Sequence, residues 1–195
     1  MTMTLSKKQH LSGEVAENAK EAGLEGGTLA TSHFEALFQR HWGRIFSVVL
    51  RLVGDPAEAE DLASEAFVQL YRTPPQRNDN PAGWLYRVAT NLGLNAIRSR
   101  YRRQRYEQEA YSLAVLHGDV QEDPAEVVEK AQERQKVRRA LSRLKSRSAQ
   151  LLMWRYAGLS YAELAQLLDV SPESIGALLV RAQREFEKSY RELEG

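Results

Sequence analysis

Basic and amide side chains recur at every third or fourth position in one segment of the chain. This row comprises Arg87, Asn91, Asn95, Arg98 and Arg102. In an α-helix, such spacing places the five side chains along one face. Guanidinium groups bind phosphates through paired hydrogen bonds, and amides can hydrogen-bond to exposed bases. The row favours contact with nucleic acid over a merely solvated basic face, because asparagine is only a middling helix former and two asparagines lie in register with the arginines.

A second row of ionisable side chains is acidic. Glu58, Asp61 and Glu65 recur at helical spacing, opposite an apolar stripe that includes Phe67 and Leu70. Carboxylates repel a polyanion, so any function of this row is docking to a basic protein surface. The alternative is a solvated face that only keeps the protein soluble.

Residues 158–184 have the pattern of two short helices joined by a tight turn. Ser160 and Glu163 have the spacing of a capping box, and Ser171 followed by Pro172 starts the second helix. This pattern is a helix-turn-helix, which places its second helix in the major groove of DNA. The alternative is an αα-hairpin that only packs within the protein.

The elements that must position these rows are helical. Apolar residues recur at three- and four-residue spacing from Phe34 to Leu52, and no segment alternates like a β-strand. Gly54 ends this helix, and prolines and asparagines mark residues 73–80 as a loop. Helix start signals occur at Ser32 with Glu35, at Asp55-Pro56, at Asn80-Pro81 and at Asp123-Pro124. The predicted fold class is all-α.

Charge divides the chain into two basic blocks and an acidic connector. Residues 84–106 carry six basic and no acidic residues, residues 107–133 carry one and eight, and residues 134–195 carry twelve and seven. We expect two small helical domains, at 32–106 and 123–195, joined by an acidic linker at 107–122. Residues 1–31 are polar and weakly patterned, which predicts a disordered tail. Two basic blocks favour a polyanion that is contacted at two places.

Composition argues against an enzyme and against a membrane protein. The chain has no cysteine, and its four histidines are scattered without metal-ligand spacing, so we expect no metal and no cofactor. No phosphate-binding loop or catalytic motif occurs, so we expect no catalytic residues. No apolar run of about 18 residues and no signal peptide are present, so we expect no membrane insertion. The absence of cysteine suits a reducing cytoplasm.

Three motifs, in order, resemble regions of bacterial sigma factors. The segment DPAEAEDLASEAFVQLYR (55–72) resembles region 2.2, and WLYRVATNLGLNAIRSRYRR (84–103) resembles regions 2.3–2.4. The segment RALSRLKSRSAQLLMWRYAGLSYAELAQLLDVSPESIGALLVRAQREF (139–186) resembles region 4. No third domain intervenes, so the chain is most similar to the extracytoplasmic function (ECF) group of the sigma-70 family.

The resemblance implies a role for each surface. Glu58, Asp61 and Glu65 would dock on the β′ clamp helices of RNA polymerase core, and the C-terminal domain would pack on the β-flap. The row from Arg87 to Arg102 would contact the −10 element of promoter DNA, beside a specificity loop at 73–82 that holds a flipped base. The second helix of the helix-turn-helix would read the −35 element. Its candidate contacts are Ser171, Glu173, Ser174, Gly176, Ala177, Arg181 and Arg184. An anti-sigma factor is an expected partner.

The sequence departs from the family pattern at three places. Ser64 replaces the usual glutamine of region 2.2, which predicts the loss of one polar contact. Glu173, Gly176 and Ala177 stand where the recognition helix usually has a lysine near its start, which predicts unusual −35 specificity. Lys145 stands where a Leu-Pro turn is common, which predicts a longer helix entering region 4.

Two other functions fit part of the sequence. A stand-alone transcriptional regulator with a helical sensor domain explains residues 158–184, but it leaves the acidic row and the Arg/Asn row without a role. An enzyme acting on nucleic acid, such as a recombinase, needs a nucleophile or clustered metal-binding carboxylates. The acidic row instead has the spacing of an outward helix face.

Overall fold

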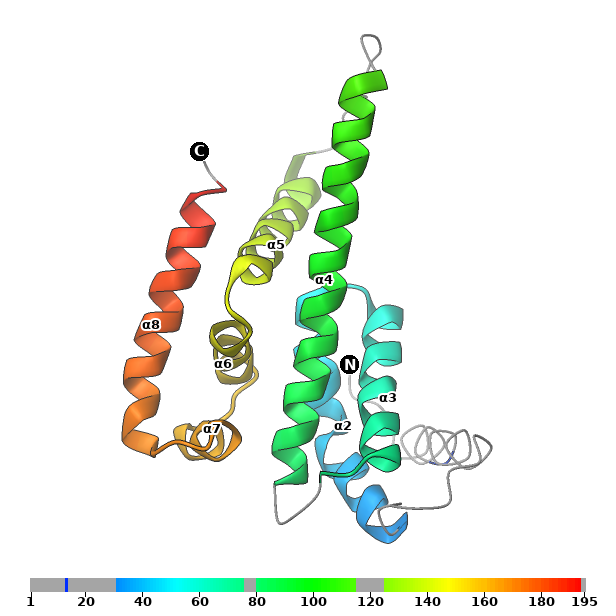
Figure 1. Cartoon of the computed structure of the whole chain (residues 1–195), viewed down its shortest axis with the longest axis vertical. Coiled ribbons are helices and arrows are strands. Elements are labelled where there is room, and N and C mark those ends of the chain that lie inside the picture. Colours follow the sequence, from blue (N-terminus) through cyan, green and yellow to red (C-terminus); the bar gives the residue numbers. More distant parts are fainter. Residues whose placement is uncertain (1–12, 14–30, 76–79, 115–124, 194–195) are drawn as a thin grey trace.

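The computed structural model describes Gly13 and residues 31–75, 80–114 and 125–193. Apart from Gly13, the described residues form seven helices, α2 to α8, and no strand (Figure 1). The first three helices form one bundle: α2 (Thr31–Val53), α3 (Pro56–Arg72) and α4 (Pro81–Ala114). The other four are α5 (Ala125–Arg143), α6 (Ser146–Tyr156), α7 (Tyr161–Leu168) and α8 (Pro172–Arg191). The all-α prediction is confirmed.

An aromatic cluster fills the core of the first bundle. Phe38 of α2 stacks on Trp42, with ring centroids 4.8 Å apart, and Phe67 of α3 lies 4.8 Å from Phe38. All three side chains are buried, because the apolar stripes of α2 and α3 face each other and α4 closes the bundle. Aromatic pairs at such distances contribute to stability beyond their area of contact.

The predicted helix boundaries of the first bundle are largely confirmed. The Asp55 side chain accepts a hydrogen bond from the backbone N–H of Glu58 at 2.7 Å, and Asn80 does the same for Gly83 at 3.1 Å. Gly54 has a φ of 82°, a left-handed conformation that favours glycine and ends α2. The predicted N-cap at Ser32 is wrong, because α2 already includes Thr31 and Ser32 lies within the helix. The predicted cap at Asp123 lies outside the described residues, as does the tail except Gly13 and the backbone of Thr31.

The second bundle contains the predicted helix-turn-helix. Leu164 of α7 and Ile175 of α8 are fully buried, and Trp154 of α6 lies in the same core. Asp169 joins α7 to α8 in a left-handed conformation, with a φ of 54°. Ser171 occupies the N-cap of α8 as predicted, but its hydroxyl makes no capping bond and lies 3.0 Å from the hydroxyl of Ser174.

Two boundaries differ from the sequence-based expectations. α4 continues to Ala114, into the segment predicted as a linker, because residues 107–114 contain good helix formers and neither glycine nor proline. The longer helix predicted at Lys145 is wrong. α5 ends at Arg143, and Lys145 has an extended ψ of 141° before α6 begins.

The two bundles are in contact along α4. This helix contacts α2 and α3 on one side and α5, α6 and α7 on the other, so it lies in the middle of the molecule (Figure 1). No helix in the described part of the chain is long and apolar enough to cross a membrane.

Candidate nucleic-acid interface

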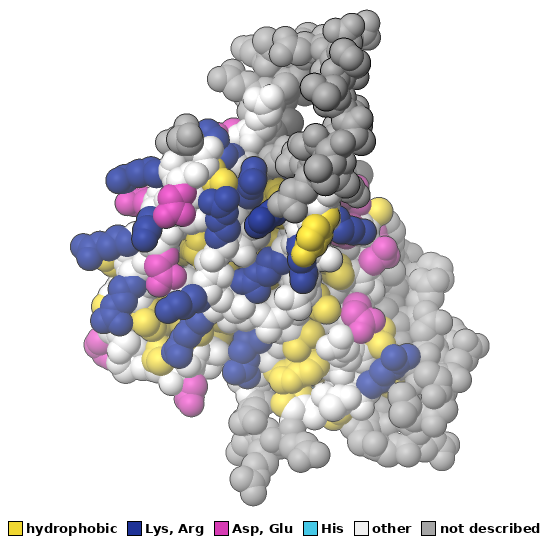
Figure 2. Space-filling model, turned by 45° about the horizontal axis from the view of Figure 1, so that its top comes forward, with side chains coloured by type: hydrophobic (Ala, Val, Ile, Leu, Met, Phe, Trp, Pro, Cys, Tyr) yellow, Lys and Arg dark blue, Asp and Glu magenta, His cyan; other side chains and the backbone are white. Residues whose placement is uncertain are grey.

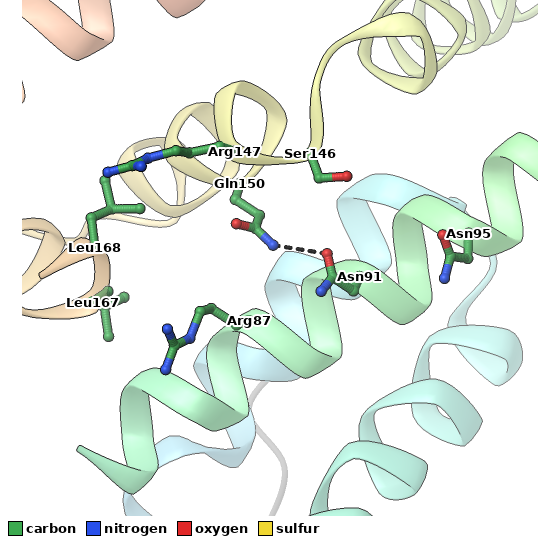
Figure 3. Close-up of a pocket in the computed structure, with 8 residues that line it drawn as sticks. All are labelled: Arg87, Asn91, Asn95, Ser146, Arg147, Gln150, Leu167 and Leu168. Carbon is green, nitrogen blue, oxygen red and sulfur yellow. Dashed lines mark hydrogen bonds between the residues drawn. The ribbon is translucent and has the colours of Figure 1, made fainter. Parts of the chain in front are cut away.

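The amide and arginine row of α4 lines a cavity between the two bundles. Arg87, Asn91 and Asn95 lie on the α4 side, while α6 and α7 form the other side (Figure 3). The cavity has a volume of about 550 Å³. Its remaining lining residues are Ser146, Arg147, Gln150, Leu167 and Leu168. The shared face predicted for these three α4 residues is therefore present, and it is turned toward the second bundle.

Asn91 is already engaged within the protein. The Nε2 of Gln150 donates a hydrogen bond to Oδ1 of Asn91 over 2.8 Å, shown as the dashed line in Figure 3. Gln150 is buried, whereas Asn91 is still exposed to solvent at the rim of the cavity. The hydrogen bond with Gln150 therefore uses the Oδ1 of Asn91 and leaves its amide N–H groups facing the cavity and solvent.

Arg98 is also held by the second bundle. Its guanidinium donates to the backbone carbonyl of Leu144 at 2.8 Å, to that of Ser142 at 3.0 Å and to the hydroxyl of Ser146 at 3.3 Å. Ser142 lies in the last turn of α5, Leu144 in the connection and Ser146 at the start of α6. Arg102, one turn further along α4, is exposed and makes no hydrogen bond or ion pair with other described residues.

The acidic row lies on α3, and its three members differ in their contacts. Glu58 forms an ion pair with Arg100 of α4, and both side chains are about one-third exposed. Glu65 accepts a hydrogen bond from Gln69 at 2.8 Å. Asp61 is exposed and makes no contact of this kind with the described residues. Asp61 is therefore the member most available to a partner.

The predicted recognition helix presents its polar residues to solvent. Ser171, Glu173, Ser174, Ala177, Arg181 and Arg184 are exposed, and Gly176 is half-buried. A hydrogen bond from its own backbone N–H, and one from Ser171, lower the pKa of Glu173. The carboxylate therefore stays charged at the N-terminal end of α8, where the helix dipole favours it.

Basic side chains gather on one face of the molecule. Figure 2 shows Lys and Arg side chains spread over the left and centre of the view, where α8, α5, α6 and α4 lie in Figure 1. Exposed arginines on these helices include Arg102 of α4, Arg143 of α5, Arg147 of α6 and Arg184 of α8. Such a surface attracts a polyanion over a distance of about one Debye length.

Two buried polar atoms lie where α2, α4 and α6 approach one another. The Nδ1 of His41 and the hydroxyl of Tyr86 are buried without a hydrogen-bond partner among the described residues. Burial lowers the pKa of His41, and the nearby Arg40 and Arg44 lower it further. Burial likewise raises the pKa of Tyr86. Both groups are therefore held in their neutral forms.

Sequence reasoning missed the contacts that join the bundles. The Nε1 of Trp154 donates to the hydroxyl of Thr90 at 2.8 Å, and both side chains are fully buried. Arg44 of α2 pairs with Glu163 of α7, and Arg51 of α2 donates to the carbonyl of Tyr156 at 3.3 Å. The available signal was a polar residue inside an apolar stripe, which both Thr90 and Gln150 provide.

Two family models match the chain, one in each bundle. The model for Sigma-70 region 2 matches residues 37–103, and the model for Sigma-70, region 4 matches residues 134–186. The first covers most of α2 and all of α3, and the second contains the complete helix-turn-helix.

Two RNA polymerase sigma factors align with most of this chain and over most of their own length. The RNA polymerase sigma-H factor of Pseudomonas aeruginosa is 26% identical over 168 residues, which cover 82% of this chain and 87% of that protein. The ECF RNA polymerase sigma factor SigW of Bacillus subtilis is 26% identical over 161 residues, which cover 77% of this chain and 84% of that protein.

Among solved structures, the sigma factor RpoE of Bartonella quintana, in a co-crystal with the anti-sigma factor NepR, aligns over 82% of this chain and 97% of that chain. Its TM-score is 0.43 and its sequence identity is 17%. The matches to both regions, in the order in which the chain carries them, show that it belongs to the ECF group of the sigma-70 family of RNA polymerase sigma factors.

Proposed function

We propose that this chain binds core RNA polymerase through α3 and directs it to promoters that α4 and α8 recognise. Members of its family are initiation factors and not enzymes. The observation that supports this proposal most is the combination, in one chain, of an acidic row on α3 with polar rows on α4 and α8. A stand-alone regulator would need only the last of these surfaces.

The α4 row is the proposed contact with the −10 element. Arg87 and Arg102 bind phosphates of the opened strand, and the amides of Asn91 and Asn95 contact unstacked bases. The loop at 73–82 holds a flipped base beside them, as in other members of the family. Residues 76–79 of this loop lie outside the described part of the chain.

The start of α8 is the proposed contact with the −35 element. The carboxylate of Glu173 can accept a hydrogen bond from the amino group of cytosine, and Arg181 and Arg184 bind flanking phosphates. A Cβ added at Gly176 would meet no atom within 4 Å, so this position leaves space for a close approach of DNA. We expect this chain to prefer a −35 sequence that differs from those preferred by family members with a lysine near the start of the recognition helix.

The proposed setting is the cytoplasm, where RNA polymerase acts. An anti-sigma factor that covers the basic surface is a further proposed partner. Its support is the basic surface itself and the co-crystal of the related RpoE with NepR.

In vitro transcription tests this function directly. Promoters are first identified by mapping transcript starts after overexpression of the chain, and run-off transcription is then measured with purified core polymerase. Core plus the chain should initiate at the mapped sites, whereas core alone should not. Asn95→Ala should reduce strand opening, measured by permanganate reactivity of thymines, more than it reduces core binding. Absence of any site-specific transcript with all mapped promoters would contradict the proposal.

A further inference from the structure

The first turn of the proposed docking helix α3 is held by a side chain of α4. α3 begins directly after the short connection formed by Gly54 and Asp55, which passes beside the middle of α4 (Figure 1). The guanidinium of Arg100 reaches both sides of this connection. Its Nη1 donates to the backbone carbonyl of Val53 at 2.9 Å, and its Nη2 forms the ion pair with Glu58. Arg100 therefore joins the end of α2, the start of α3 and the middle of α4.

Each of the two acceptors needs this donor for its own reason. The carbonyl of Val53 is one of the last four of α2, which have no partner within the helix, and Val53 is buried. The side chain of Glu58 is only about one-third exposed, so its carboxylate gains more from an opposite charge than a fully solvated one would. A planar guanidinium serves both acceptors at once, because its donors point in fixed directions from two nitrogens.

The position of Glu58 determines the direction in which the acidic row faces. Glu58 lies in the first turn of α3, where its backbone N–H also donates to the Asp55 side chain at 2.7 Å. Asp61 and Glu65 follow at three- and four-residue spacing, so they lie on the same side of the helix. Because α3 is a continuous helix, holding Glu58 against α4 also fixes the direction in which Asp61 and Glu65 project.

The three carboxylates of the row are not equally available to a partner. Asp61 and Glu65 are exposed, whereas Glu58 is half-buried. Glu65 accepts its hydrogen bond from Gln69 of the same helix, while the partner of Glu58 belongs to another helix. A basic protein surface can therefore approach Asp61 and Glu65 without breaking any contact between α3 and α4.

We propose that Arg100 and Glu58 form a positioning pair for core docking, and that Asp61 and Glu65 make the direct contacts with core polymerase. This inference rests on the proposed function, in which α3 is the docking helix. Arg100 acts on polymerase binding only through Glu58, by keeping the first turn of α3 in one orientation. Without the pair, α3 has the right orientation in only a fraction of the molecules, and the apparent affinity for core falls by that fraction.

The direction in which Arg100→Gln changes core binding separates this role from its alternative. If Glu58 contacts polymerase itself, Arg100 competes for its carboxylate, and removing Arg100 strengthens core binding. If the pair positions α3, the same change weakens core binding by about three- to ten-fold, a loss between those of exposed and buried ion pairs. Fluorescence anisotropy of the full chain, labelled at its N-terminus and titrated with purified core polymerase, measures the affinity. Unchanged or tighter binding by Arg100→Gln would overturn the proposal.

A double-mutant cycle tests whether the two residues act as one unit. Glu58→Gln, and the double variant Arg100→Gln with Glu58→Gln, should each weaken core binding about as much as Arg100→Gln alone, because all three break the same pair. Asp61→Asn should weaken binding by a factor that multiplies with that of Arg100→Gln, because Asp61 makes a separate contact. Effects of Arg100→Gln and Glu58→Gln that multiply fully would show that the two residues act independently, against the proposal.

Three further variants separate positioning from a general loss of stability. Arg103→Gln makes the same charge change three residues along α4, at an exposed side chain without a hydrogen bond or ion pair to other described residues, and should leave core binding unchanged. Ile45→Val lowers stability at a buried position of α2 and should also leave it unchanged below the melting temperature. Arg100→Lys keeps the charge without the planar fork, so its core affinity should lie between those of Arg100→Gln and the wild type. A loss of core affinity in Ile45→Val equal to that in Arg100→Gln would reduce Arg100 to a structural residue.

Failure of this proposal differs from failure of the proposed function. A wild-type chain that does not bind core contradicts the proposed function, whatever the Arg100 variants do. A wild-type chain that binds core, together with an Arg100→Gln variant that binds at least as tightly, overturns only the positioning pair.

Discussion

The ion pair between Arg44 of α2 and Glu163 of α7 joins the two bundles, and the carboxylate of Glu163 also belongs to the capping box that starts α7. One oxygen of Glu163 accepts from Arg44 at 3.1 Å, and the other accepts from the backbone N–H of Ser160 at 2.7 Å and from its hydroxyl at 2.9 Å. The hydroxyl of Ser160 in turn accepts from the N–H of Glu163. The beginning of α7 and the position of α7 against α2 therefore depend on the same side chain.

We expect Glu163 to make stability depend on acid pH. The hydrogen bonds from Ser160, and then Arg44, lower the pKa of Glu163 below its ordinary value of 4.5. A lowered pKa in the folded state gives stability that is present above pH 4.5 and is lost as the pH falls through the folded value. Urea unfolding of the wild type and of Glu163→Gln between pH 3 and 7 measures this, and the stability difference between them should disappear at the acid end. Ser160→Ala should cost about 1 kcal/mol at neutral pH, as for other N-caps.

His41 should produce a second pH dependence in a different range. Burial and then Arg40 and Arg44 lower its pKa below 6.5, so the unfolded state binds the proton first. Stability is therefore full above about pH 6.5 and falls as the pH drops through the folded value. His41→Asn should flatten the unfolding free energy between pH 5 and 7. A wild-type slope that persists in this variant would show that another group titrates.

The aromatic cluster should dominate the stability of the first bundle. Phe67 is fully buried and lies within 5.6 Å of Trp42 and 4.8 Å of Phe38, measured between ring centroids. Phe67→Ala should lower the free energy of unfolding by about 3–5 kcal/mol, because it removes the ring and leaves a cavity. Phe67→Leu should cost much less, and urea denaturation compares the two.

Within the acidic row, substitutions at Asp61 and at Glu58 should have different effects on core binding and stability. Asp61→Lys should weaken binding to core polymerase while leaving the melting temperature nearly unchanged, because Asp61 is exposed and unpaired among the described residues. Glu58→Lys should lower both, because it also leaves Arg100 facing a like charge. Co-purification with core and thermal melting give the two readouts, with Glu35→Lys on α2 as an exposed control. Normal core binding by Asp61→Lys would remove this residue from the surface.

Gly176 offers a test of the recognition helix. A Cβ there meets nothing within 4 Å, and alanine is the better helix former, so Gly176→Ala should stabilise the protein by about 0.5–1 kcal/mol. If DNA approaches the backbone at this position, the same variant should reduce transcription from promoters that depend on the −35 element. Thermal unfolding and run-off transcription together decide whether the glycine is used for DNA contact. Unchanged transcription would show that DNA keeps its distance from this position.

Local signals predicted the helices well. The stripes of α2 and α3, the cap at Asp55 and the capping box at Ser160 depend on residues a few positions apart, so they could be read directly from the sequence. The charge of the sequence changes at residue 107 but its helix propensity does not, so α4 continues to Ala114 across the expected boundary.

Contacts between distant residues could not be predicted in this way. Glu58 and Arg100 are 42 positions apart, and Thr90 and Trp154 are 64 apart, so no periodicity links them. The Arg/Asn face of α4 was visible as a row, but the bundle that covers it was not. Whether a polar face meets solvent or another part of the chain is decided by tertiary packing, which a single helical pattern does not contain.

The length of α4 has a mechanical consequence. With 34 residues it is about 50 Å long, and only its first part packs against α2 and α3 in the first bundle. A rigid rod of this length turns a small rotation at one end into a large displacement at the other, about 4 Å for a tilt of about 5°. A rotation at the base of α4 would thus be amplified at its tip near Ala114, about nine turns of helix away.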